Sequence, residues 1–453
     1  MMLKIRTYHL VLFLPLLLSA RTMLVTNADE VKRAMKSAAP GDTVMLRSGV
    51  WTDERIQCSA NGTKDQPVVL MAERAGSVML TGTSQLRFSG EWIVVQGLLF
   101  SGGAIEGKKG AVIEFRTSSK EEASHARLTE CAIVDYNPQD KWLDYKWVSV
   151  YGRENRVDHC TFLNKRHQGT LLVVWLDSLP GRHRIDHNYF GPRPVHGENG
   201  AETIRIGTSE WSMFSSATMV ENNYFYSCDG EVEIISNKSC NNVYRWNTFV
   251  ECAGTLTLRH GNRTEVYGNH FFGRQKKNSG GVRVIGEDQK VHDNYFDGLA
   301  GEKQFSAMSF MLGVKDSPAN GYFQVKRAEV RNNTFVDCKS VLLLGVVGSN
   351  PAADLPPEAS SITKNLILRN SGTLLSAPVP SEQISIAGNV SDGPSPAGLA
   401  NSQVRSADVA ITKGEDNVWR PTAVVAAGMG PEALLRHPVS AGETGSPWYT
   451  NTK

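Results

Sequence analysis

Short segments in which apolar and polar residues alternate recur along most of the chain. Clear examples are ETIRIG, GEVEIIS, GTLTLRHG and GGVRVIG, separated by stretches rich in Gly, Asn and Asp. A period of two is typical of a β-strand with one buried face. The pattern therefore predicts many short strands joined by tight bends.

A three-residue phrase, Asn-X-Phe, repeats in step with these strands. It occurs at 188–190, 223–225, 247–249, 269–271, 294–296 and 333–335. Weaker versions are CAI at 131–133, CTF at 160–162 and NLI at 365–367. The shortest intervals between third residues are 24, 22 and 25 residues, and periods in the twenties indicate a solenoid. No L-x-x-L-x-L pattern is present, which excludes leucine-rich repeats.

A coil of this length with three short strands predicts an all-β fold, a right-handed parallel β-helix. We expect the repeated Asn to lie at a bend, where it tolerates left-handed dihedrals and stacks on the Asn of the next coil. The Phe or Ile that ends each phrase should point into the core.

The residues from Asn27 to Ala38 predict an α-helix that caps this solenoid. Asn27 to Glu30 has the form of a capping box, and one helical face carries Val31, Ala34, Met35 and Ala38. An amphipathic helix there would cover the open end of the core, as solenoids require.

The first twenty residues have the features of a secretory signal. Lys4 and Arg6 precede the apolar run Leu10 to Leu18, and Ser19-Ala20 offers a small-residue cleavage site. No other segment is apolar enough to span a membrane. We therefore predict a secreted or periplasmic protein. The predicted organisation is a signal peptide at 1–20, a parallel β-helix domain at 21–375, and terminal coils with a C-terminal tail at 376–453.

Composition narrows the class of partner. The chain of 453 residues has 41% hydrophobic residues and a formal net charge of +2, and removal of the signal leaves it near neutral. A nucleic-acid partner is therefore not supported.

The seven cysteines form no C-x-x-C pair, which disfavours a zinc site, and we expect mostly buried thiols. The sequence leaves open whether the protein is a monomer or a homodimer.

Alternation also sorts charged residues onto the outer surface. In EVEII, Val232 and Ile234 should point inwards and the flanking glutamates outwards. Applied to successive coils, the same rule predicts one outer wall that carries Arg205, Glu231, Glu233, Arg259 and Arg283. Polar stripes are ordinary on a β-helix, but Glu and Arg are poor strand formers, so this one invites a functional interpretation.

Two glutamates two positions apart on one strand repel each other unless a cation lies between them. A hard divalent cation with oxygen ligands would resolve the conflict, and outside the cell Ca²⁺ is the usual choice. Asn199 and Glu202 on the preceding coil could add oxygens. Asn199 has the outward parity of its strand, whereas Glu202 needs a local bend at Gly200 to reach the same face.

These residues resemble polysaccharide lyase family 6, which contains alginate lyases and the dermatan-cleaving chondroitinase B. The likeness rests on ENGAETIRIG, GEVEIISNK and LRHGN and extends from the capping helix to about residue 375. Its spacing is specific, with E-x-E, Lys five residues on, and Arg twenty-one residues later. The resemblance implies Lys238 as general base and Arg259 as general acid. It also implies the calcium ligands Asn199, Glu202, Glu231 and Glu233.

The chemistry of uronic-acid polymers agrees with this assignment. β-Elimination removes the C5 proton beside the carboxylate and breaks the C4–O bond. A cation on that carboxylate stabilises the enolate-like intermediate. Lys238 must be neutral to accept the proton, and a nearby cation and arginine favour the neutral amine. Arg259 stays charged, so it would stabilise charge or orient a proton at the leaving oxygen.

Weaker candidates complete the predicted substrate site. His260, beside Arg259, could contact sugar or assist the acid, and Arg205 and Arg283 could bind neighbouring uronate carboxylates. Arg263 and Tyr267 are further candidates for the wall. For each of them, an ordinary surface role is the competing interpretation.

The favoured function is a calcium-dependent alginate lyase, with three alternatives. A dermatan sulfate lyase would share the mechanism, but the sequence shows no extra basic cluster for sulfate groups. A β-helical glycoside hydrolase would need carboxylates on both sides of the scissile bond, which one strand does not provide. A non-catalytic glycan-binding β-helix would use the same cation only for structure.

Overall fold

The computed structural model describes residues 20–107, 110–197, 199–348, 352–369, 372–376, 383–393, 403–422, 434 and 436–449. The predicted signal peptide, apart from Ala20, lies outside them. In this part of the chain no helix is long and apolar enough to cross a bilayer.

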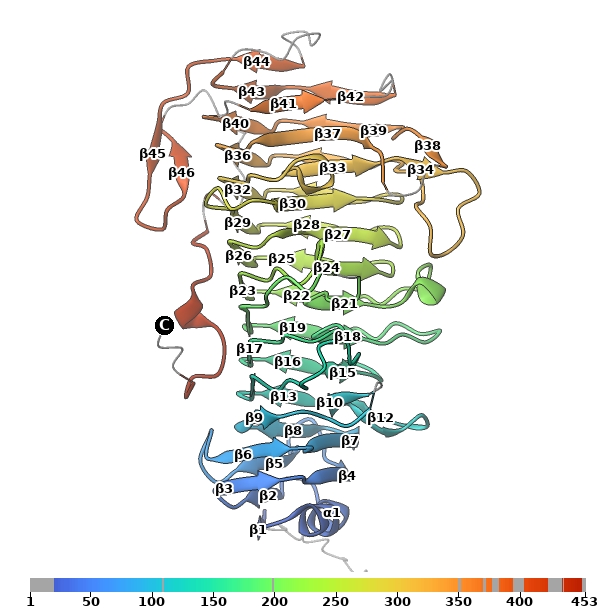
Figure 1. Ribbon diagram of the computed structural model, residues 1–453, viewed down its shortest axis with the longest axis vertical. Helices are drawn as coiled ribbons and strands as arrows, with labels where there is room; N and C mark the ends of the chain where they lie inside the picture. Colours follow the sequence, from blue (N-terminus) through green and yellow to red (C-terminus); the bar gives the residue numbers. More distant parts are fainter. Residues whose placement is uncertain are drawn as a thin grey trace, which may run out of the picture.

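Three parallel sheets run the length of the molecule (Figure 1). Sheet A consists of β1 (Thr22–Val25), β2 (Thr43–Leu46), β5 (Val68–Ala72), β8 (Ile93–Gln96), β13 (Arg127–Thr129), β16 (Arg156–Asp158), β19 (Arg184–Asp186), β22 (Met219–Glu221), β25 (Val243–Arg245), β28 (Glu265–Tyr267), β31 (Lys290–His292), β35 (Glu329–Arg331), β39 (Ser360–Thr363) and β42 (Ile384–Ala387).

Sheet B consists of β3 (Gly49–Thr52), β6 (Val78–Gly82), β9 (Leu98–Gly103), β14 (Ala132–Val134), β17 (Thr161–Leu163), β20 (Tyr189–Phe190), β23 (Tyr224–Tyr226), β26 (Thr248–Val250), β29 (His270–Phe272), β32 (Tyr295–Asp297), β36 (Thr334–Val336), β40 (Leu366–Leu368), β43 (Asn389–Ser391) and β44 (Val404–Ser406). Sheet C consists of β4 (Arg55–Asn61), β7 (Gln85–Glu91), β10 (Ala111–Glu114), β11 (Arg116–Ser118), β12 (Glu121–Ser124), β15 (Lys146–Val150), β18 (Leu172–Val174), β21 (Ile204–Ile206), β24 (Glu233–Lys238), β27 (Gly254–His260), β30 (Ser279–Val284), β33 (Met308–Met311), β37 (Ser340–Val346) and β41 (Thr373–Ser376).

Each coil passes once through sheets A, B and C before the next coil begins one strand further along. Strand n of one coil pairs in parallel with the corresponding strand of the next, as in β22 with β25 and β23 with β26. Parallel crossovers are right-handed almost without exception. The predicted all-β, right-handed parallel β-helix is therefore confirmed.

The repeated asparagines form a continuous internal ladder at the bend between sheets A and B. Each side-chain amide donates to the side-chain oxygen of the next, at 2.9–3.0 Å, through Asn188, Asn223, Asn247, Asn269, Asn294, Asn333, Asn365 and Asn389. The expected left-handed backbone belongs instead to the preceding residue, such as Trp246 with a φ of 57°. That residue turns the chain so that the Asn side chain points inward, where its amide can bond to backbone carbonyls.

The aromatic residue of each repeat fills the core as predicted. Ring centroids of successive coils lie 4.5–5.2 Å apart through Phe162, Phe190, Phe225, Phe249, Phe271, Phe296 and Phe335. Stacking at the coil spacing buries these rings completely or nearly so. All seven cysteines are buried and free.

The N-terminal end of the stack is covered by α1 (Ala28–Ser37), as the sequence predicted. The Asn27 side chain accepts from the Glu30 amide at 2.9 Å, whereas the Glu30 carboxylate accepts from the amide of Thr26 rather than of Asn27. Val31, Ala34 and Met35 are buried against the first coils. The helix thus shields the otherwise open core from water.

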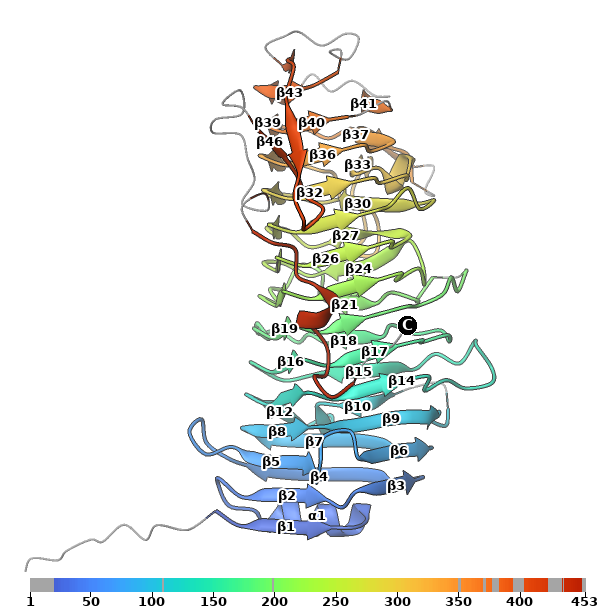
Figure 2. The same ribbon diagram turned by 90° about the vertical axis from the view of Figure 1, so that its left-hand side faces the viewer.

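Parallel strands continue beyond residue 375, through β42, β43 and β44. The chain then forms the antiparallel hairpin of β45 (Ile411–Lys413) and β46 (Trp419–Pro421), and its last described residues run back along sheet B (Figures 1 and 2). Smaller elements are β34 (Gly313–Val314), which pairs with β38 (Ala353–Leu355), and the 3-10 turns η1 (Ser209–Trp211), η2 (Lys303–Phe305) and η4 (Ala441–Glu443).

Candidate functional site

Most of the predicted site residues gather on the outer face of sheet C, where β21, β24, β27 and β30 lie side by side. The pairing register places Arg205 opposite Ser236, Ser236 opposite Thr257, and Thr257 opposite Arg283. The expectation that the glutamate pair shares this register is wrong. Glu233 is the first residue of β24 and Glu231 precedes the strand, so both lie before its in-register part begins.

A β-bulge at the start of β24 explains the difference. Glu233 pairs with Thr255 but Ile235 pairs with Leu256, so one extra residue, Ile234, is inserted on β24. Ile234 and Ile235 are both in the core, whereas Val232, predicted to point inwards, is only partly buried. The bulge breaks strict alternation and re-aims the side chains before it.

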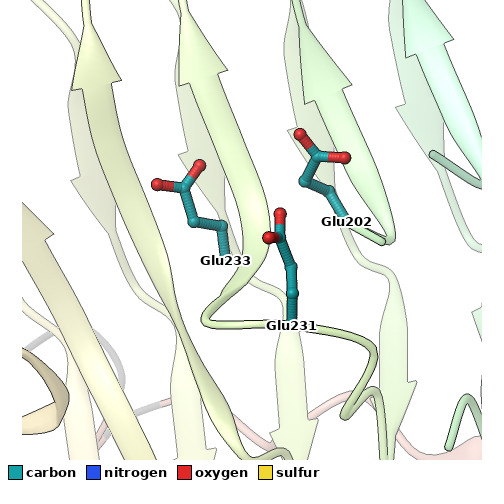
Figure 3. Close-up of side chains that lie close together, drawn as sticks. All are labelled: Glu202, Glu231 and Glu233. Atoms are coloured by element: carbon teal, nitrogen blue, oxygen red, sulfur yellow. The ribbon is translucent and has the colours of Figure 1, made fainter. Parts of the chain in front are cut away.

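The bulge and a neighbouring bend bring three carboxylates together. Glu202, Glu231 and Glu233 each place one oxygen within 4.8 Å of the others, and Figure 3 shows Glu231 between the other two. Glu202 reaches this face through the predicted bend at Gly200, which has a φ of 97°. Thr170 donates to the second oxygen of Glu202 at 2.8 Å and fixes that carboxylate.

The three carboxylates cannot all be ionised at neutral pH without a counter-charge. Burial, together with the negative charges of Glu202 and Glu233, raises the pKa of Glu231 to about 9. Burial also opposes ionisation of Glu202, but the positive charges of Arg205 and Lys238 hold its pKa below the usual value. The Oε1 atom of Glu231 is buried and has no hydrogen-bond partner among the described residues.

This donor set fits a divalent cation. Carboxylate oxygens are the ligands that hard cations prefer, and an ion between the glutamates would satisfy the orphaned Oε1 of Glu231. Among the described residues, this is the one group of three or more acidic, His or Cys side chains close enough to share an ion. Asn199 is exposed in the bend that precedes β21.

Four basic side chains surround the carboxylates. The Nζ of Lys238 and Nη1 of Arg205 lie 3.9 and 4.0 Å from Oε1 of Glu202. Arg283, which is almost fully buried, donates to Glu233, and the Nε of Arg259 lies 3.7 Å from the same oxygen of Glu233. Arg283 is therefore engaged by a glutamate rather than open to solvent.

Lys238 and Arg259 lie on adjacent strands at the edge of the acidic group. A second register shift separates Asn237 from Lys238, which pairs with His260. The side chains of Lys238 and Arg259 are each 17% exposed. Both therefore reach the surface from a largely desolvated position. Burial also lowers the pKa of Arg259, although Tyr322 and Glu233 oppose that shift.

His260 is buried and neutral. Burial and the charges of Arg259 and Lys238 lower its pKa to about 3. Its two ring nitrogens lie 3.2 Å from the Ser209 hydroxyl and 3.4 Å from Nη1 of Arg259. It can orient its neighbours but does not add a positive charge at neutral pH.

Arg263 and Tyr267 lie apart from this group. The Nε of Arg263 donates to Asn241 at 3.0 Å from an exposed corner after β27. Tyr267 belongs to sheet A, where its hydroxyl accepts from Arg245 at 2.8 Å and its ring stacks on His292. The predicted wall ends before these residues because the chain leaves sheet C at Gly261.

Two neighbours of the site were missed from the sequence. Arg193 is fully buried and donates to the carbonyl oxygens of Glu202, Gly169 and His167, at 2.6, 2.9 and 3.2 Å. It thereby holds the backbone that carries Glu202. Tyr322 lies over the guanidinium of Arg259, 4.2 Å from ring centroid to carbon. Neither has a sequence signal, because both come from irregular loops.

A family profile and several solved structures are similar to this chain, and they point to one class of protein. A family profile described as chondroitinase B matches residues 25–426. The structure is similar to that of the PL6 family alginate lyase AlyGC, with 39% sequence identity and a TM-score of 0.91, over 95% of this chain and 59% of that one. This chain thus spans little more than half the length of that relative. No curated protein sequence gave a match.

Two further solved structures match over nearly their whole length. One is described as a mannuronic acid specific polysaccharide family 6 lyase from human gut microbiota, with 28% identity and a TM-score of 0.81 over 95% of this chain and 97% of that one. The other is the PL6 family polysaccharide lyase Pedsa3628 from Pseudopedobacter saltans, with 29% identity and a TM-score of 0.72 over 94% of this chain and 100% of that one.

Proposed function

Since the chain belongs to polysaccharide lyase family 6, the family of chondroitinase B, we propose that it is a calcium-dependent alginate lyase that cleaves by β-elimination. The observation that carries this proposal is the position of Lys238 and Arg259 beside three clustered carboxylates on one face of sheet C. The similarity to an alginate lyase at 39% identity favours alginate as the polymer.

Lys238 is the proposed general base. Its amine lies at the rim of the acidic group, where it can approach the C5 proton of a uronate whose carboxylate faces the glutamates. Glu202, 3.9 Å away, holds the amine in place without a close hydrogen bond. A positioned base of this kind contributes roughly 10²–10⁴-fold to a rate.

Arg259 and Arg205 would act on the charges of the sugar. Arg259 keeps its own proton at any working pH, so it would stabilise the negative charge that develops on the leaving O4, while water supplies the proton that completes the leaving hydroxyl. Arg205, on the adjacent strand, would bind a neighbouring uronate carboxylate. Neutral His260 would orient Arg259 through the contact at 3.4 Å.

Glu202, Glu231 and Glu233 would hold the calcium ion, with Asn199 as a further oxygen donor. When bound, the ion supplies charge neutralisation at the substrate carboxylate, which makes the C5 proton more acidic. The glutamates therefore serve the reaction through their geometry and charge and take no proton from the sugar.

The proposal is tested by ultraviolet absorbance of alginate mixed with the purified protein. Elimination leaves a C4=C5 double bond conjugated to a carboxylate, which absorbs, whereas hydrolysis leaves none. We expect absorbance to rise with the native protein and to stay flat with Lys238→Ala. With the native protein, a calcium chelator should slow the rise. A flat trace from the native protein on every uronate polymer, with no new reducing ends, would leave a non-catalytic glycan-binding protein.

Dermatan sulfate is the second candidate substrate, because the family profile that matches residues 25–426 is described as chondroitinase B. The same absorbance assay with dermatan sulfate separates the two. Activity on dermatan sulfate and none on alginate would replace the first proposal while leaving the roles of Lys238 and Arg259 unchanged.

We also propose export to the periplasm or the outside of the cell, from the signal-like residues 1–20. Mass spectrometry of the protein recovered outside the cytoplasm should give a mature chain that begins at Arg21. Recovery of the full-length chain in the cytoplasm alone would contradict this.

A further inference from the structure

The guanidinium of Arg259 is held mainly by a loop far away in the sequence. Nη1 donates to the carbonyl oxygen of Gly321 at 2.8 Å, and Nη2 to that of Asn320 at 3.3 Å. The ring of Tyr322 covers the guanidinium at 4.2 Å. All three contacts come from the connection between β34 and β35, about sixty residues downstream.

The loop is itself anchored on both sides of these contacts. The amide of Val314 donates to the carbonyl oxygen of Tyr322 at 2.8 Å, and the side chain of Gln324 donates to the carbonyl oxygen of Pro356 at 2.8 Å. The Tyr322 ring also packs against a small apolar cluster on the outside of sheet C, formed by Ile285, Met311 and Val346. Tyr322 therefore has a fixed position from which to act on Arg259.

Without these contacts, the nearest anionic partner of Arg259 is a carboxylate of the acidic group. Nε of Arg259 lies 3.7 Å from Oε1 of Glu233, too far for a hydrogen bond. A guanidinium and a carboxylate this close readily pair, and Arg259 would then compete with Arg283 and Ser236, which already donate to the two oxygens of Glu233. Such a pair would occupy oxygens that a cation needs and would withdraw Arg259 from the sugar.

We propose that Tyr322, with the carbonyl groups of Asn320 and Gly321, is a positioning element that keeps Arg259 off Glu233. Neutral carbonyls and an aromatic face hold a guanidinium without neutralising it, so Arg259 remains charged and free to act on substrate. The role in catalysis rests on the proposed function, whereas the effect on Glu233 does not.

The test compares Tyr322→Leu, which removes the aromatic face, with Tyr322→Phe, which keeps it. We expect Tyr322→Leu to lower kcat roughly tenfold, in line with a partly desolvated cation–π contact, with little change in KM. Tyr322→Phe should stay within about threefold of the native kcat, because the proposed role uses the ring and not the hydroxyl. Equal losses in both variants would assign a role to the hydroxyl and overturn the proposal.

Calcium titration gives a second measurement that needs no catalytic activity. In Tyr322→Leu, Arg259 should move onto Glu233 and raise the Kd for calcium several-fold, and the double variant with Arg259→Met should restore it. Tyr226→Leu, at a partly buried tyrosine on sheet B, controls for a general loss of packing and should leave the Kd unchanged. An unchanged Kd in Tyr322→Leu would overturn the proposal. Inactivity of the native protein on uronate polymers would instead contradict the proposed function.

Discussion

At the scale of single residues, the site is a balance of opposed charges in a poorly solvated place. Three carboxylates share one space, and the positive groups around them are within 4.0 Å but mostly beyond hydrogen-bond distance. Such an arrangement is costly on its own, since each charge has lost water without a full partner. A bound cation would pair with the carboxylates and an anionic substrate with the basic groups, and together they would offset this cost.

The proposed base can be separated from a simple positive charge by the change Lys238→Arg. Arginine keeps the charge beside Glu202 but cannot be deprotonated at a working pH. We expect the rate of double-bond formation to fall by roughly 10²–10⁴-fold, as in Lys238→Ala, while calcium binding persists. Lys64→Arg, at an exposed lysine near the N-terminal end, is the matched control and should keep full activity. Substantial activity in Lys238→Arg would show that charge alone suffices.

Cation affinity should rise with pH because Glu231 must lose its proton first. Its pKa near 9 in the ion-free protein means that at pH 6–8 cation binding displaces a proton. Affinity should therefore increase by up to about tenfold per pH unit below that pKa, as measured by calorimetric titration. The variant Glu231→Gln removes the proton and should flatten the dependence. An affinity independent of pH in the native protein would mean that Glu231 is already ionised or is not a ligand.

The same raised pKa predicts the direction of the stability change. Glu231 binds its proton more tightly folded than unfolded, so its contribution to ion-free stability is fully present below pH 4.5 and is lost as the pH rises through about 9. Melting curves of the chelated protein over that range should show the decline, and Glu231→Gln should reduce it. A contribution that instead grew with pH would contradict the assignment.

At the scale of elements, the regular repeats build the solenoid, whereas local irregularities in the strands form the site. The Asn ladder and the Phe stack repeat in almost every coil and set the spacing of the strands. The bulge in β24 and the bend at Gly200 interrupt that order at adjacent coils, and the acidic group forms where they meet. Strained or irregular backbone is often concentrated at functional sites in this way.

Replacement of one ladder asparagine should lower the free energy of unfolding substantially. Asn247 donates to Val220 and Asn269, and its side-chain oxygen accepts from both the backbone and the side chain of Asn223. The change Asn247→Ala leaves buried groups of Asn223 and Val220 unsatisfied, at about 1–3 kcal/mol each. We expect a free energy of unfolding lower by about 2–4 kcal/mol in urea titration. A loss below about 0.5 kcal/mol would show that water or neighbouring groups replace the ladder bonds.

At the scale of the whole molecule, the C-terminal tail connects distant coils that otherwise contact only their neighbours. Arg436 donates to Asn222, Gly445 to the carbonyl oxygen of His187, Ser446 to Thr161, and Trp448 to the carbonyl oxygen of Glu130. The tail therefore runs antiparallel to the growth of the solenoid and contacts several coils on the sheet B side (Figure 1). In a repeat protein such long-range contacts add cooperativity.

The tail contact is tested by Trp448→Ala. The indole fills the space beside Gly76, where even a Cβ would lie 2.3 Å from the ring. Because Trp448 is partly buried, we expect its removal to lower the free energy of unfolding by about 1–3 kcal/mol without changing activity per folded molecule. The control Leu179→Ala removes an exposed apolar side chain and should cost under about 0.5 kcal/mol. Equal stability in the two variants would mean that the tail contributes nothing.

Much of this architecture was predictable because it is periodic. The Asn-X-Phe repeat, strand alternation and the capping helix each express a local rule that the next coil repeats, so the three-sheet solenoid followed from them. The spacing of Glu231, Glu233, Lys238 and Arg259 likewise placed these residues on neighbouring strands. The predictions of inward Val232 and of a shared register for the glutamates failed, because a one-residue bulge reverses parity and period-two reasoning assumes none.

The sequence by itself determined the kind of fold, the face that carries the chemistry and the residue types gathered there, since these depend on spacing along one repeating strand pattern. Tertiary structure alone decided which side chains meet. In the folded chain, Glu202 points toward the other two glutamates and Arg283 is buried against Glu233. Tyr267 lies on sheet A, and the ring of Tyr322 covers the guanidinium of Arg259. Those outcomes depend on bulges, bends and long loops, whose geometry is fixed by packing between coils rather than by any local period.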